Sequence, residues 1–328
     1  MVYLKLELAF RLLGKKRKGT HEGINPEMSA WDFICGEVAK AKERHSYKTA
    51  ANYLTAANSL SQFWGHKKWA FPDIIHDEMG CFQRWLVERG LCMNTISCYM
   101  RSLRTLYNRA VECGLVQDTH PFAKVFTGKE HTHKRSAQEE DVHRLRNLFI
   151  GDGSSLSLAR DIFLFSFYAM GMPFVDIAFL RKSQIRNGQF KYARHKTGQE
   201  IVVSIEPCMA EIMVKYAHVD TDYVFPIITE QDNTLAYKQY QSQLRLYNHN
   251  LGILSKRIKA SQPLSSYVVR HTWASLAYKH DFDVKLISKA LGHTNTSTTL
   301  IYIKSLFDPK LADANHHLLA KLDIESEL

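Results

Sequence analysis

The chain has 328 residues, which favours two domains, and its 45% hydrophobic content is enough for two cores. No apolar run approaches the roughly 20 residues of a membrane-spanning helix, and the charged start MVYLKLELAF does not fit a secretory signal. The six cysteines include no CxxC pair, so we expect reduced thiols in a cytoplasmic protein without membrane association.

The net charge of +10 is distributed unevenly along the chain. Residues 1–135 hold 21 Lys/Arg against 13 Asp/Glu, whereas the remainder holds 22 against 20. This asymmetry favours a polyanion that is bound mainly by the N-terminal half. A basic surface that only aids solubility explains the charge alone equally well, and the residues near the C-terminus, described below, favour DNA.

The N-terminal half is predicted to be a basic arm followed by a helical bundle. Residues 1–26 form the arm, and residues 27–127 read as four or five helices that make a core DNA-binding domain. On the last of these helices Ser97, Arg101, Arg104 and Asn108 share the polar face. We expect phosphate contacts from Arg101 and Arg104, supported by Lys48, Thr49 and Asn52. For any one of these residues, an ordinary solvated face is the alternative.

A linker is predicted at residues 128–135, before a second domain at residues 136–306. The linker holds an H-x-H pair, His131 and His133, but no third or fourth metal ligand accompanies it, so we interpret both as surface histidines. Ser136 and Glu139 have the spacing of a capping box, which predicts that the first helix of the second domain begins there.

The second domain is predicted to be mainly helical with a small antiparallel meander. A buried helix over residues 157–170 is followed by strands at 183–186, 189–193 and 201–205, and Asn187-Gly188 is the hairpin turn between the first two. Arg194, His195 and Lys196 fall at the second turn. A long helix is predicted over residues 234–260, and a separate amphipathic tail helix at 307–328 follows the domain.

Three residues near the C-terminus have side chains suited to phosphodiester exchange. Arg270 lies in a helix that Ser265 or Ser266 caps, His293 follows a helix that ends at Gly292, and Tyr302 lies nine residues beyond His293. Exchange without metal or ATP needs a nucleophilic oxygen, cationic donors to the phosphate and a proton donor to the leaving group. These side chains would supply most of that set.

The stretch R-H-T-W-A-S, then L-G-H, then T-x-x-Y resembles the catalytic core of the tyrosine recombinases, the phage-integrase family, and the resemblance covers about residues 27–315. The segments SFYAMGMPFVDIAFL and SYVVRHTWAS are most similar to the branch on conjugative elements and invertible DNA segments of anaerobic gut bacteria. The resemblance implies a helical N-terminal bundle and an α+β catalytic domain. It implies that Tyr302 is the nucleophile, that Arg270 clamps the phosphate, and that His293 hydrogen-bonds the phosphate or accepts the tyrosine proton.

By the same resemblance Lys196 protonates the departing 5′-oxygen, while two positions depart from the family pattern. Tyr267 stands where the second motif normally begins with a histidine, and its hydroxyl can still donate to a phosphate oxygen. Pro173 stands where the first arginine is normally found. Arg194 is our candidate replacement, and the weaker candidates are Arg160, Arg181 or a side chain of a partner subunit. His271 is predicted to be a buried packing residue.

The resemblance implies a site-specific recombinase that inverts or integrates DNA through a 3′-phosphotyrosine, with no metal or nucleotide cofactor. The implied partners are double-stranded DNA and three further copies on two DNA segments, with a monomer in free solution and an accessory DNA-bending protein as a further candidate. The tail at 307–328 would dock on a neighbouring protomer. The missing arginine keeps a non-cleaving DNA-binding protein open as the alternative, and a topoisomerase-like enzyme is a third.

Overall fold

The computed structural model describes residues 29–303 except 67, 131 and 133–134, and it does not describe the side chains of residues 301–303. The predicted arm, the tail helix and the H-x-H pair therefore lie outside the described residues. The chain divides into two compact units, residues 1–131 and 132–328. Among the described residues, no helix is both long and apolar enough to cross a membrane.

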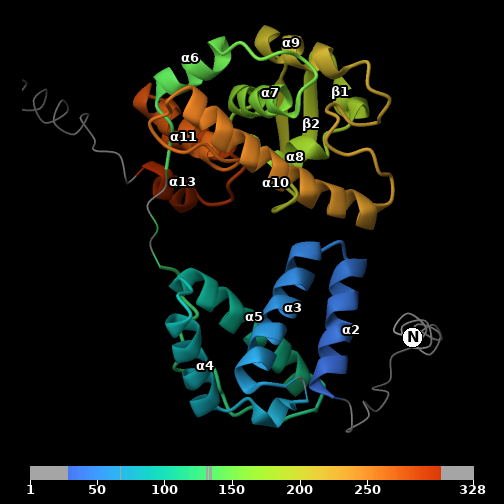
Figure 1. The fold of residues 1–328 in the computed structure, drawn as a ribbon, viewed down its shortest axis with the longest axis vertical. Coiled ribbons are helices and arrows are strands. Elements are labelled where there is room, and N and C mark those ends of the chain that lie inside the picture. The colour runs from blue at the N-terminus through green and yellow to red at the C-terminus, as the bar shows by residue number, and fades with distance from the viewer. Residues whose placement is uncertain (1–28, 67, 131, 133–134, 304–328) are drawn as a thin grey trace, which may run out of the picture. The chain divides into compact units, whose positions relative to one another are not determined.

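Between residues 29 and 130 the N-terminal unit contains the helices α2 (Ala30–Glu43), α3 (Tyr47–Trp64), α4 (His76–Glu88) and α5 (Met93–Glu112), with a short 3-10 turn η1 (Phe71–Asp73) before α4 (Figure 1). Helix α3 packs against both α2 and α5. The side chains of Leu60, Phe82 and Leu106 are completely buried where these helices meet. Apolar residues at helical spacing thus form one core, as the sequence predicts.

Residues 126–130, here called the return segment, run back along α5 and are fixed to it by side chains. The Ser97 hydroxyl donates to the Gly128 carbonyl at 2.6 Å. The Asn94 amide donates to the Glu130 carbonyl at 3.0 Å and accepts from the Glu130 N–H at 2.9 Å. The prediction that Ser97 lies on the open polar face is therefore wrong, because the return segment covers it and leaves it fully buried.

The C-terminal unit surrounds a central buried helix, α7 (Ser155–Tyr168), as Figure 1 shows. Helices α6 (Glu139–Asn147), α8 (Phe174–Ala178), α9 (Pro207–Tyr216), α10 (Asn233–Arg257) and α11 (Val268–Lys279) all pack on α7. Two short helices, α12 (Val284–Ala290) and α13 (Thr296–Ile303), follow and pack on each other and on α11. The side chain of Phe165 on α7 is completely buried and contacts rings from the sheet and from the segment before α10.

The sheet is an antiparallel meander in the order β1-β2-β3, formed by β1 (Ile185–Arg186), β2 (Gln189–Ala193) and β3 (Glu200–Ser204). Strands β2 and β3 alternate exposed and buried residues, which places Phe190 and Tyr192 against the core. Asn187 and Gly188 both have positive φ, as a two-residue hairpin turn requires. Strand β1 is shorter than predicted, because Lys182–Gln184 forms a 3-10 turn, η2. The predicted fold class, mainly helical with a small antiparallel meander, is confirmed.

The chain enters the C-terminal unit through a segment that long-range hydrogen bonds hold in place. The Ala137 N–H donates to the Thr272 hydroxyl oxygen at 2.9 Å, which ties the segment to α11. The Asp141 carboxylate accepts from the Gln138 N–H at 3.0 Å and from the Ser261 N–H at 3.1 Å. The capping box predicted for Ser136 and Glu139 is therefore wrong. The N-cap of α6 is Gln138, and the Asp141 carboxylate reaches back to the Gln138 N–H.

Candidate active site

Arg270 lies in the interior of the C-terminal unit, with only 2% of its surface exposed. Helix α11 begins at Val268, with Tyr267 as its N-cap instead of the predicted Ser265 or Ser266, and this places Arg270 in its first turn. The guanidinium donates through Nη1 to the Gly171 carbonyl at 3.0 Å and through Nη2 to the Leu291 carbonyl. Gly171 has φ +72, and a Cβ there would lie 3.0 Å from the Arg270 Cα, so α11 can approach only a glycine.

His293 is held at the end of α12 by the backbone, as predicted. Gly292 adopts φ +61, and the His293 N–H returns to the Ser288 carbonyl at 3.0 Å, which closes the helix end. The imidazole Nε2 lies 3.2 Å from Arg270 Nη2, and Nδ1 lies 2.8 Å from the Thr299 hydroxyl oxygen. Three elements, α11, α12 and α13, therefore meet at this ring.

Arg194 reaches the same place from the turn after β2. Its side chain is 8% exposed, and Nη1 donates to the Leu291 carbonyl at 2.8 Å and to the Gly292 carbonyl at 3.3 Å. Arg194 and Arg270 thus share one acceptor, the Leu291 carbonyl oxygen, at the C-terminal end of α12. The structure brings these two arginines and His293 together.

Asp176 is a buried carboxylate at this site that the sequence analysis missed. Its Oδ1 accepts from the His195 N–H at 2.9 Å and contacts His195 Nδ1 at 3.0 Å. Its Oδ2 lies 3.6 Å from Arg194 Nε, which is too long for a hydrogen bond but within range of charge attraction. Pro173, where the family pattern has an arginine, is instead the N-cap of α8, the helix that carries Asp176. An acid on the buried face of a short helix is the signal that could have revealed it.

The remaining predicted residues lie around this cluster with different exposure. Lys196 is exposed in the turn between β2 and β3, and Tyr267 is 51% exposed with its ring packed edge-on against His271. His271 is buried, as predicted. Tyr302 belongs to α13, but its side chain is outside the described residues.

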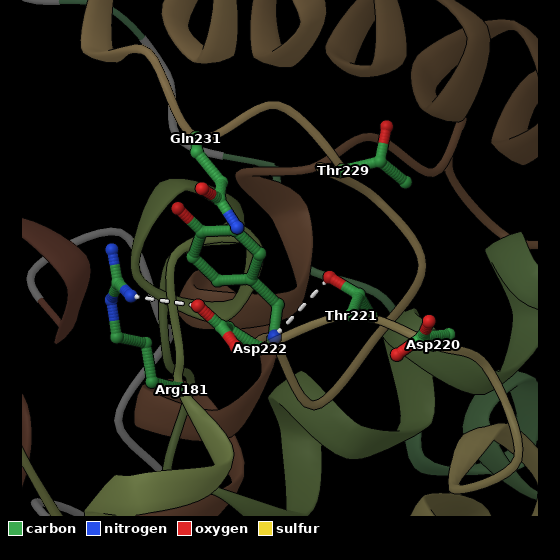
Figure 2. Close-up of a pocket in the computed structure, with 7 residues that line it drawn as sticks. Arg181, Asp220, Thr221, Asp222, Thr229 and Gln231 are labelled. Carbon is green, nitrogen blue, oxygen red and sulfur yellow. Dashed lines mark hydrogen bonds and ion pairs between the residues drawn. The ribbon is translucent and has the colours of Figure 1, made fainter.

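The two weaker candidates for the missing arginine have partners elsewhere. Arg160 pairs with Asp161 at 2.8 Å and donates to the Leu148 carbonyl at 2.8 Å. Arg181 lies at the edge of a pocket of about 440 Å³ and pairs with Asp222 at 3.4 Å, as Figure 2 shows. Within the described residues, neither arginine forms a hydrogen bond or ion pair with Arg194, Arg270 or His293, so of the three candidates for the missing arginine only Arg194 belongs to this cluster.

The cluster is electrostatically positive, and this affects His293. Burial, followed by the charges of Arg270, Arg194 and Lys196, lowers the pKa of His293 to about 4. The imidazole is therefore neutral near pH 7. Within the described residues, no group of three or more His, Cys, Asp or Glu side chains is placed to hold a metal ion.

The predicted DNA contacts of the N-terminal unit lie on its two packed helices α3 and α5. Lys48, Thr49, Arg101 and Arg104 are exposed, and Asn52 is half-buried. Thr49 lines a pocket of about 320 Å³ with residues from the C-terminal end of α5, whereas Arg101 and Arg104 lie in the middle of that helix. Arg104 also contacts Thr127 of the return segment at 3.4 Å.

We predict that Gly292→Ala is more destabilising than Gly198→Ala. Both glycines have positive φ, φ +61 and φ +69, which costs an L-residue about 1–2 kcal/mol. A Cβ at Gly292 would also lie 2.7 Å from the Arg194 Cδ, whereas a Cβ at Gly198 meets nothing within 4 Å. Urea unfolding of both variants measures the difference, and equal losses of stability would contradict the close approach of Arg194 to Gly292.

We also predict that His293 contributes to the loss of stability in acid. The folded chain keeps the imidazole neutral until its pKa of about 4, whereas the unfolded chain takes up the proton near the ordinary value of 6.5. The unfolded state thus binds more protons in this window, and stability falls as the pH falls through it. In urea titrations at a series of pH values, the free energy of unfolding of His293→Gln should fall with a shallower slope than that of the wild type, and an unchanged slope would contradict this contribution.

Comparison with known proteins supports the resemblance seen in the sequence. Residues 136–308 match the model of the phage integrase family, and residues 30–125 match the phage integrase SAM-like domain. The tyrosine recombinase XerD of Rhizobium meliloti is 24% identical over 300 residues, which cover 87% of this chain and 94% of that protein. The tyrosine recombinase XerC of Bacillus licheniformis is 24% identical over 274 residues, 81% of this chain and 88% of that protein.

Solved structures share the fold. A lambda integrase (75–356) dimer bound to a COC′ core site matches with a TM-score of 0.61 at 15% identity and covers 84% of this chain and 95% of that one. A lambda integrase tetramer bound to a Holliday junction matches with a TM-score of 0.59 at 14% identity, over 92% of this chain and 86% of that one. Because the family model alone spans more than half of the sequence, the chain belongs to the phage integrase family, the tyrosine recombinases.

Proposed function

We propose that this protein is a site-specific DNA recombinase that cuts and rejoins DNA through a 3′-phosphotyrosine formed on Tyr302. The observation that carries this proposal is the convergence of Arg270, Arg194 and His293 around the end of α12, beside the helix that holds Tyr302. Membership of the tyrosine recombinase family supports the same reaction.

The chemistry requires one bond to form and one to break at phosphorus. The Tyr302 oxygen attacks, its proton passes to His293 Nε2, and the bond to the 5′-oxygen breaks while Lys196 protonates that oxygen. The phosphotyrosine keeps the energy of the phosphodiester bond, so rejoining needs no ATP. Nε2 faces a donor-only guanidinium and therefore carries the lone pair. For Nε2 to take the proton, that guanidinium N–H must turn to the bound phosphate, whose charge also offsets the arginines that lower the His293 pKa.

Arg194 is proposed to take the part of the missing first arginine. It shares the Leu291 acceptor with Arg270 and comes from the turn that also carries Lys196. Both of its hydrogen bonds to the described residues use Nη1. Nη2 can therefore donate to a nonbridging phosphate oxygen. Tyr267, half exposed beside His271, is proposed as a further donor in place of the usual histidine.

DNA binding is proposed to combine both units. The basic N-terminal half supports phosphate contacts from Arg101, Arg104, Lys48, Thr49 and Asn52. We keep the division into an arm at 1–26, a core-binding domain at 27–127, a linker at 128–135, a catalytic domain at 136–306 and a tail at 307–328, with Gly128 and Glu130 of that linker fixed to α5 in the return segment.

The proposed assembly is a monomer in solution that forms a tetramer on two DNA segments, with the tail docked on a neighbour. The lambda integrase tetramer bound to a Holliday junction supports such an assembly here. A cytoplasmic, nucleoid-associated location, an accessory DNA-bending protein and membership of the gut-bacterial branch complete the proposal. The non-cleaving alternative rested on the absent arginine and is less favoured, since Arg194 lies beside Arg270.

We predict that wild-type protein forms a covalent DNA adduct that Tyr302→Phe cannot form. Duplexes that the protein binds would be selected from a randomised pool, nicked at successive positions and analysed on denaturing gels. Loss of the hydroxyl removes the nucleophile and leaves binding intact. Absence of any adduct from the wild type across the nicked series would favour the non-cleaving alternative, and relaxation of supercoiled DNA without a partner site would favour the topoisomerase-like one.

We predict that Arg194→Ala lowers the rate of adduct formation by about 10²–10³-fold, the usual loss for one donor to a developing oxyanion. Duplex affinity should change by no more than about twofold, because one phosphate contact among many is lost. Arg186→Ala, which removes an exposed arginine from β1 of the same sheet, is the matched control. Near-normal cleavage by a folded Arg194→Ala variant would contradict the replacement.

A further inference from the structure

The two ring nitrogens of His293 contact groups of opposite hydrogen-bonding character. Nε2 lies 3.2 Å from Nη2 of Arg270, and Nδ1 lies 2.8 Å from Oγ1 of Thr299. A guanidinium can only donate, whereas a hydroxyl oxygen can both donate and accept. The two contacts therefore restrict where the imidazole can carry its proton.

These contacts define one tautomer. Because Nη2 of Arg270 supplies a hydrogen, Nε2 must present its lone pair. A neutral imidazole then carries its hydrogen on Nδ1 and donates it to Thr299 Oγ1. The imidazolium form would place an N–H against the guanidinium, and the lowered pKa of His293 agrees with a neutral ring.

Thr299 is placed to hold this arrangement through the helix that carries the nucleophile. Its side chain is completely buried, and it lies on α13 three residues before Tyr302, about one helical turn. The neighbouring Thr298 is exposed, so these two adjacent threonines have opposite environments. Helix α13 packs on both α11 and α12. Helix α11 carries Arg270, and α12 ends just before His293.

We propose that Thr299 is a positioning residue: by accepting the Nδ1 hydrogen it holds the His293 imidazole in the Nδ1–H form, in which Nε2 carries a lone pair and no hydrogen. The site thereby has its base only while α13 is docked, so that delivery of Tyr302 and preparation of its proton acceptor are one event. This inference rests on the proposed function, in which His293 Nε2 takes the Tyr302 proton. Within the described residues the Thr299 hydroxyl is hydrogen-bonded to His293, and its effect on the reaction passes through that ring.

The test compares Thr299→Val, Thr299→Ser and the matched control Thr298→Val. Histidine ¹⁵N shifts of the DNA-free protein, with His293 assigned from a His293→Gln spectrum, report which nitrogen carries hydrogen. We expect Nδ1–H in the wild type, in Thr299→Ser and in Thr298→Val, and a mixture or the Nε2–H form in Thr299→Val. Adduct formation on nicked duplexes selected from a randomised pool should fall by about 10–100-fold in Thr299→Val only, by analogy with the loss of the hydrogen-bond partner that orients a metal-bound histidine.

Three results would overturn the inference. They are a wild-type His293 with hydrogen on Nε2, an unchanged tautomer in a folded Thr299→Val, and wild-type cleavage by that variant despite a changed tautomer. Thermal melting shows whether the variant is folded, and recovery in Thr299→Ser separates loss of the hydroxyl from a packing defect. If no protein forms an adduct, the proposed function fails, while the ¹⁵N shifts still decide whether Thr299 sets the tautomer.

Discussion

The carbonyl oxygen of Leu291 is the acceptor on which the whole candidate site depends. Two guanidiniums, from Arg194 and Arg270, donate to it although like charges repel. The last carbonyls of a helix lack partners within the helix and carry partial negative charge, so the end of α12 offsets part of this repulsion. The buried carboxylate of Asp176, near Arg194 Nε, offsets a further part of the repulsion between the two arginines. Positive charge is thus concentrated where a phosphate would bind, before any DNA arrives.

Close approach of the backbone makes this arrangement possible at two glycines. Gly171 lets α11 lie close enough for Arg270 to reach the Gly171 carbonyl, and Gly292 leaves the space that the Arg194 side chain occupies. Both have positive φ, so a larger residue would meet steric contact and backbone strain together. Both buried arginines are thereby held by backbone carbonyl oxygens, those of Gly171, Leu291 and Gly292.

Local patterns in the sequence predicted the elements of the site better than its contacts. The Asn187-Gly188 turn, strand β2 and the helix end at Gly292 each follow from a few adjacent residues. The hydrogen bond between Arg194 and Leu291 joins positions 97 residues apart, and its acceptor is a backbone carbonyl. Every residue has such a carbonyl, so the residue types in the sequence do not reveal this contact. The sequence also misplaced the cap of α6. Asp141, which caps this helix, accepts a hydrogen bond from the Ser261 N–H, 120 residues away in the chain.

The return segment has a consequence for dividing this protein into fragments. The match to the SAM-like domain ends at residue 125, yet Asn94 and Ser97 bond to Glu130 and Gly128 beyond that end. A fragment that ends at residue 125 would expose the buried Ser97 hydroxyl and leave the side chains of Ser97 and Asn94 on α5 without these hydrogen bonds. On the other side, Thr272 needs the Ala137 N–H. Severing the chain between 131 and 136 leaves both halves with the backbone that completes them.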